Sequence, residues 1–138
     1  MAGAIEAVCP NNLGAQRLAA GAMGCLWTWF LFLTARYIAR RTDYAIIATV
    51  VFLTCYNTVL MGRSATWDIY CHALMMGAIY LLLRALNEER DYRWQLPLAG
   101  LFLGLSWLSK GPVSFYTLLL PFLLSIVTLP SITTRGKW

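Results

Sequence analysis

The chain has 138 residues, of which 59% are hydrophobic and only 12% are charged. A soluble domain carries about 25% charged residues, so these few charges cannot cover a water-facing surface, and the high hydrophobicity also excludes an intrinsically disordered chain. The net charge is +5, but the basic residues stand singly between long apolar runs, which argues against nucleic acid as a partner and favours membrane lipids.

Five apolar segments approach the roughly 20 residues needed to cross a bilayer, namely residues 18–37, 44–61, 67–86, 92–109 and 113–129. The fourth is the weakest, because its continuous apolar core covers only residues 96–108 and Pro97 has to fit into its first turn. Pro121 is expected to kink the fifth. The sequence therefore predicts an all-α, polytopic membrane helix bundle of about five transmembrane helices in a single domain.

Basic residues are distributed unequally between the two sides of this predicted bundle. The side with the loops after the first, third and fifth helices holds eight, which are Arg36, Arg40, Arg41, Arg84, Arg90, Arg93, Arg135 and Lys137. The other side holds three, which are Arg17, Arg63 and Lys110. Because cytoplasmic loops are enriched in Lys and Arg, the first side is predicted to be cytoplasmic.

This orientation puts residues 1–16 outside the cytoplasm. Residues 1–10 nevertheless lack the basic region and the apolar length of a signal peptide. A preceding transmembrane helix would resolve the conflict. We therefore expect the sequence to be a fragment of a longer polytopic protein, with residues 1–16 as the remnant of an outer loop.

Asp68 is one of three ionisable residues, with Arg63 and Lys110, at helix ends on the predicted outer side. A charged residue at the centre of a membrane helix costs about 2.5 to 3.5 kcal/mol on insertion scales, and less towards the interface, so Asp68 should face a cavity or a partner. A structural role is the alternative, in which Ser64 or Thr66 caps the third helix and Asp68 complements the positive end of its dipole.

Lys110 stands where Gly111 and Pro112 should end the fourth helix. It could bind a lipid-linked phosphate, or it could simply extend to the interface and satisfy the last carbonyl groups of the helix. Arg63 allows the same two interpretations, and its guanidinium suits bidentate phosphate contacts.

A metal site is not expected. Asp68, Cys71 and His72 are spaced at i, i+3 and i+4, so they share a helical face. A catalytic zinc site usually has three protein ligands and a structural one has four, and the sequence offers no second cluster. We interpret His72 as a hydrogen-bonded interfacial residue and predict no metal or other cofactor in this chain.

Several short motifs follow one another in a distinctive order. They are Arg17-Leu18, Ala35-Arg36, Gly62-Arg63-Ser64-Ala65-Thr66-Trp67-Asp68, Ala99-Gly100-Leu101-Phe102-Leu103-Gly104-Leu105 and Leu108-Ser109-Lys110-Gly111-Pro112-Val113. With these motifs the chain resembles the bacterial polytopic glycosyltransferases of the protein O-mannosyltransferase and 4-amino-4-deoxy-L-arabinose (lipid A) transferase superfamily, which have a GT-C type fold.

The resemblance implies an enzyme of the bacterial cytoplasmic (inner) membrane that transfers a sugar from a polyprenyl phosphate to lipid A, a protein or a glycan on the periplasmic side. It also implies further helices and an acidic outer loop outside this sequence, so the isolated chain is expected to be inactive. Whether the full-length enzyme uses a divalent cation is left open. Asp68 would then be catalytic, whereas Arg63 and Lys110 would bind the donor phosphate. The alternative is a small non-enzymatic membrane protein, a subunit or a transporter piece, in which the same residues are interfacial anchors.

Overall fold

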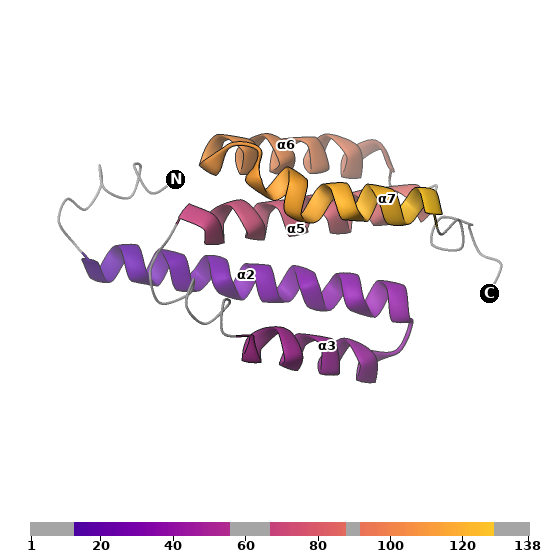
Figure 1. Cartoon of the computed structure of the whole chain (residues 1–138), viewed down its shortest axis with the longest axis horizontal. Coiled ribbons are helices and arrows are strands. Elements are labelled where there is room, and N and C mark those ends of the chain that lie inside the picture. The colour runs from indigo at the N-terminus through magenta and orange to yellow at the C-terminus, as the bar shows by residue number, and fades with distance from the viewer. Residues whose placement is uncertain (1–12, 56–66, 88–91, 129–138) are drawn as a thin grey trace.

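A computed structural model describes residues 13–55, 67–87 and 92–128 (Figure 1). The helices are α2 (Leu13–Ala39), α3 (Thr42–Thr54), α5 (Trp67–Asn87), α6 (Tyr92–Lys110), a π-helical segment η1 (Phe115–Leu119) and α7 (Leu120–Thr128). Within these ranges the chain forms no β-strand, and the all-α fold predicted from the sequence is confirmed.

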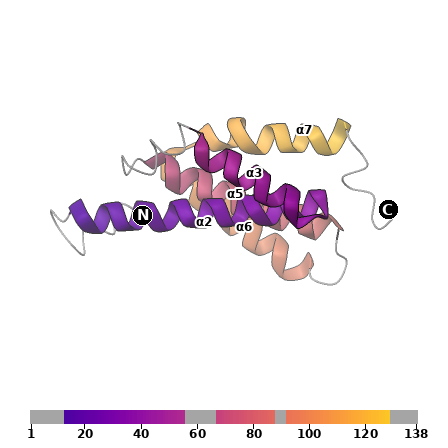
Figure 2. The ribbon, with the colours of Figure 1, turned by 90° about the horizontal axis from the view of Figure 1, so that it is seen from below.

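Helix α5 forms the centre of the bundle. It packs against α2 on one side and α6 on the other, while α3 packs on the far side of α2 (Figure 1). Figure 2 shows α6 and α7 on opposite flanks of the bundle. Most of the buried apolar side chains therefore belong to α5, among them Ile69, Met75, Ile79 and Leu83.

Gly77 allows the three central helices to approach one another closely. A methyl group at this position would lie 2.8 Å from the ring of Phe102 on α6 and 2.9 Å from that of Phe30 on α2. These two rings also pack edge to face, with centroids 6.0 Å apart. The missing side chain of Gly77 is thus the space into which both aromatic rings fit.

Threonine hydroxyl groups within the helices are satisfied by their own helix. The side chains of Thr28, Thr34 and Thr49 each donate to the carbonyl group four residues earlier, at 2.9, 2.7 and 2.7 Å. Such bonds hide a polar group without help from a neighbouring helix or from water. They allow helices with threonines to face lipid.

Large apolar side chains cover much of the outer surface. On α3 and α6 the exposed ones include Ile46, Ile47, Val50, Leu101 and Leu108. An apolar surface of this extent is unfavourable in water and favourable in a bilayer. Among the described residues, the segments Gly14–Ala39 and Asp68–Asn87 are the two helices long and apolar enough to cross a membrane.

The second helix differs from its predicted extent of residues 44–61. It begins at Thr42 and ends at Thr54, and Cys55 has an extended backbone. The helix can end here because the Thr54 hydroxyl and the Cys55 N–H bond to carbonyl groups of the last turn, those of Val51 and Phe52. Residues 56–61 lie outside the described ranges.

The two helical prolines sit differently in their helices. Pro97 is the sixth residue of α6, which begins at Tyr92, so it lies in the second turn of the helix and not in the first turn as expected. Near Pro121 the chain forms the π-helical segment η1, where the Leu120 N–H bonds to the Phe115 carbonyl. A proline has no N–H to continue the ordinary α-helical pattern, and a π-helical turn just before it accommodates this loss.

Candidate functional site

Asp68 and Lys110 form an ion pair at one end of the bundle. Asp68 lies in the first turn of α5, Lys110 is the last residue of α6, and the Lys110 Nζ donates to Asp68 Oδ1. The Lys110 side chain is 43% exposed and that of Asp68 is 20% exposed, so the pair can be reached from outside. The sequence predicted both residues at helix ends on one side but did not predict that they pair.

The turn after Lys110 explains why its side chain lies at this place. Gly111 has a φ of +72°, which favours glycine, and its N–H bonds to the Trp107 carbonyl at 2.7 Å. This bond ends α6, and Pro112 then accepts the N–H groups of Phe115 and Tyr116 as the next helix begins. Lys110 therefore stands at the negative end of one helix dipole, whereas Asp68 stands at the positive end of another.

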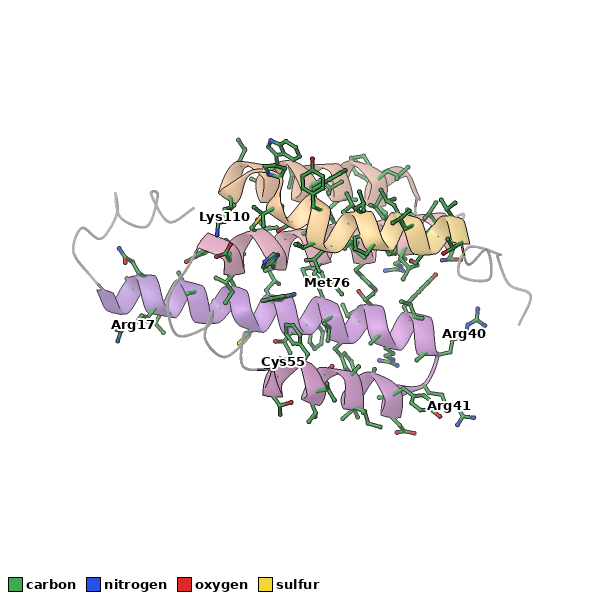
Figure 3. The ribbon with its side chains drawn as sticks, viewed as in Figure 1. Arg17, Arg40, Arg41, Cys55, Met76 and Lys110 are labelled. Carbon is green, nitrogen blue, oxygen red and sulfur yellow. The ribbon has the colours of Figure 1, made fainter. Side chains whose placement is uncertain are left out.

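The two ends of the bundle differ in charge as the sequence predicts for the described residues. Figure 3 shows Arg17 and Lys110 towards one end, and Arg40 and Arg41 at the opposite end beside the turn between α2 and α3. Arg36 and Arg84, in the last turns of α2 and α5, lie at the same end as Arg40 and Arg41, so among the described residues the Asp68–Lys110 pair lies at the end with fewer basic residues. In apolar surroundings each charge of the pair lowers the cost of the other.

A buried polar network lies directly beneath the ion pair. The Ser106 hydroxyl donates to the Cys71 carbonyl at 2.9 Å, and the Cys71 thiol contacts the Ser106 carbonyl at 3.2 Å. The Ser114 hydroxyl lies 2.8 Å from the Cys71 sulfur and 2.9 Å from His72 Nδ1. The expectation that His72 is hydrogen-bonded is thereby confirmed.

Trp27 borders this polar end on the α2 side. Its ring centroid lies 5.4 Å from that of His72 and 4.8 Å from that of Phe52 on α3. The indole therefore connects the polar network to the apolar packing between α2 and α3.

An apolar groove begins at the same place and follows α2 and α3. Its volume is about 620 Å³, and it is lined by Gly21, Gly24, Cys25, Trp27, Thr28, Trp29, Phe32, Thr49, Leu53 and Ile69. Ile69 is the neighbour of Asp68 in α5, and Trp27 contacts His72. The groove thus ends near the polar network and one residue from Asp68, and its lining residues do not include either member of the ion pair.

Asp68, Cys71 and His72, which share a face of α5, each make contacts with other residues. In the part of the chain that the structure describes, no three His, Cys, Asp or Glu side chains come together to hold a metal ion. The Cys71 thiol is directed to Ser106 and Ser114, and Asp68 pairs with Lys110. Arg63, the third predicted site residue, lies outside the described ranges.

Ser106 and Ser114 are site residues that the sequence reasoning missed. They lie four residues before and four residues after Lys110. For Ser106 this spacing was the available signal, because a residue four positions away lies on the same side of a helix. Ser114 follows the helix end at Gly111, so the spacing gave no signal for its contacts with Cys71 and His72. A serine in an apolar helix is otherwise unremarkable, since it can bond to its own backbone.

Comparison with known proteins yields one match. A family model described as dolichyl-phosphate-mannose-protein mannosyltransferase matches residues 1–138. No curated protein and no solved structure matches the chain.

Proposed function

The chain belongs to the dolichyl-phosphate-mannose-protein mannosyltransferase family of integral membrane glycosyltransferases, and from this premise we propose that its Asp68–Lys110 site binds the phosphate of a polyprenyl-phosphate-linked sugar. The acceptor is lipid A, a protein or a glycan. In this proposal the site lies on the periplasmic side of the bacterial inner membrane. The larger number of basic residues at the other end of the bundle, where Arg36 and Arg84 add to Arg40 and Arg41, supports this location.

The reaction needs positive charge at the departing phosphate. An acceptor hydroxyl oxygen forms a bond to the anomeric carbon of the sugar, and the bond from that carbon to the phosphate oxygen breaks. The bonding electrons leave with the phosphate, and the hydroxyl proton passes to a carboxylate base, which the family resemblance assigns to an outer loop. A fixed ammonium group beside the phosphate stabilises the developing negative charge.

Lys110 supplies that ammonium group, and its pairing with Asp68 is the observation that carries the proposal. A carboxylate partner directs the lysine to one position before the donor arrives. Asp68 is proposed to position the substrate or to assist the base. Arg63 is proposed as a second phosphate ligand, on the resemblance alone.

The apolar groove gives the donor lipid a place beside its phosphate. It runs along α2 and α3 and reaches Ile69, one residue from Asp68. An isoprenoid chain in this groove would bring its phosphate to Lys110 while its hydrocarbon stays out of water. The proposal requires no cofactor from this chain, and it is compatible with a divalent cation bound elsewhere in a complete enzyme.

Loss of sugar transfer on removal of either charge tests the proposal. In the complete protein, Asp68→Asn and Lys110→Ala should abolish transfer and still insert into the membrane. Asp43→Asn and Arg41→Ala are matched controls at the opposite end of the bundle, where both residues are exposed, and both should transfer normally. Near-normal transfer by both Asp68→Asn and Lys110→Ala would instead identify the pair as an anchor between α5 and α6, as in a non-enzymatic membrane protein.

A further inference from the structure

The chain segments immediately before and after Lys110 are both hydrogen-bonded to α5. Ser106 precedes Lys110 by one helical turn and Ser114 follows it by four residues, and both side chains are fully buried. Both serines bond to the same short stretch of α5, which consists of Cys71 and His72. That stretch begins three residues after Asp68, the ion-pair partner of Lys110.

Each hydroxyl, thiol and imidazole proton of the network can be assigned to one hydrogen bond. The Ser106 hydroxyl gives its proton to the Cys71 carbonyl, so the Cys71 thiol is the donor towards the Ser106 carbonyl. The sulfur can then accept from the Ser114 hydroxyl, whose oxygen accepts from His72 Nδ1. A network with every proton used is strong in surroundings without competing water.

We propose that Ser106, Ser114 and Cys71 are positioning residues that clamp the Lys110 turn onto α5 and so hold the Lys110 ammonium group against Asp68. The backbone on both sides of Lys110 is fixed by buried bonds, whereas the ion pair itself is partly exposed. A partly exposed pair of flexible side chains loses much of its Coulomb attraction to solvent and to side-chain entropy. The clamp fixes the backbone that carries Lys110, so that forming the ion pair orders only the two side chains and not the turn as well.

The purpose of the clamp rests on the proposed function, but its existence can be measured without sugar transfer. The measurement is the rate at which a small amine-reactive ester acylates Lys110 in the full chain, followed by mass spectrometry of the peptide that contains it. Pairing with Asp68 protects the Lys110 amine, so Asp68→Asn sets the rate expected for a released lysine. That rate should exceed the wild-type rate by about two- to five-fold.

Variants of the network should then separate a clamp from ordinary packing. Ser114→Ala and Cys71→Ala should raise the acylation rate of Lys110 to that of Asp68→Asn. Cys71→Ser keeps a donor and an acceptor at the same place and should restore the wild-type rate. Ser125→Ala is the matched control, because the Ser125 hydroxyl bonds only within its own helix, to the Phe122 carbonyl at 2.7 Å.

The outcomes distinguish the clamp from the proposed function. Wild-type acylation rates in both Ser114→Ala and Cys71→Ala, with helical circular dichroism unchanged, would overturn the clamp. If one of these two variants fails to accumulate in the membrane, the acylation rate of Lys110 in the other variant, compared with the rate in Cys71→Ser, decides between a clamp and ordinary packing. A raised acylation rate together with polyprenyl-phosphate binding that is independent of Lys110 would support the clamp and contradict the proposed function.

In an active enzyme the clamp additionally predicts that Ser114→Ala raises the KM for the donor, with little change in the KM for the acceptor.

Discussion

The indole of Trp27 on α2 packs against the imidazole of His72 on α5, with ring centroids 5.4 Å apart. Trp27 also lines the apolar groove, and His72 bonds to Ser114 in the polar network. In the proposed function, this contact separates the groove that would hold the hydrocarbon chain of the donor from the polar end that would hold its phosphate.

Replacement of Trp27 should weaken binding of the donor chain. Trp27→Leu removes one of the three aromatic side chains that line the groove, so we expect the affinity for a long polyprenyl phosphate to fall several-fold. The affinity for a short-chain analogue should change less, because its phosphate contacts remain. Trp107→Leu is the control, since Trp107 is exposed on α6 and does not line the groove. If Trp27→Leu and Trp107→Leu lose the same affinity for the long polyprenyl phosphate, the groove does not hold the lipid.

Gly77→Ala should destabilise the centre of the bundle. The new methyl group would meet the rings of Phe30 and Phe102 at 2.8 to 2.9 Å, and such overpacking costs about 1 to 3 kcal/mol. Thermal unfolding in detergent micelles measures the effect. Gly100→Ala is the matched control in α6, where a methyl group meets nothing within 4 Å, and it should be neutral or slightly stabilising. If Gly77→Ala unfolds at the same temperature as Gly100→Ala, the packing of α2, α5 and α6 described above is contradicted.

The orientation of the site can be tested by cysteine labelling. In a background without the native cysteines, Asp68→Cys and Lys110→Cys should react with a membrane-impermeant maleimide added to intact spheroplasts. Asp43→Cys, at the other end of the bundle, should react only after the membrane is opened. Labelling of positions 68 and 110 from opposite faces is incompatible with the ion pair, and labelling of both only from inside would reverse the proposed orientation.

The sequence predicted the fold class well, because apolar runs near the thickness of a membrane can hardly form anything but helices. It predicted less well where helices end. Cys55 becomes extended within a run that contains no charged residue, since the last carbonyl groups of α3 are satisfied locally by Thr54 and by the Cys55 N–H. The sequence marks that end only weakly, by the uncharged polar residues Asn57 and Thr58 that follow it.

The site was only partly predictable for a different reason. The apolar pattern and the charges indicated that Asp68 and Lys110 lie at helix ends on one side. Their pairing depends on the rotation and register of α5 against α6, which side-chain packing around Gly77 helps to set. Ser106 and Ser114 acquire their role only through that register, because each could otherwise have bonded to its own helix.

Binding of polyprenyl phosphate to the complete protein tests the central claim most directly. Wild-type protein should bind the phosphate more tightly than the uncharged polyprenol, and Lys110→Ala should lose about 10- to 150-fold of phosphate affinity, the range expected for a hydrogen bond to a charged group. Its affinity for the uncharged polyprenol should not change. If Lys110→Ala binds polyprenyl phosphate as tightly as the wild type does, the ion pair at this end of the bundle is not a phosphate site.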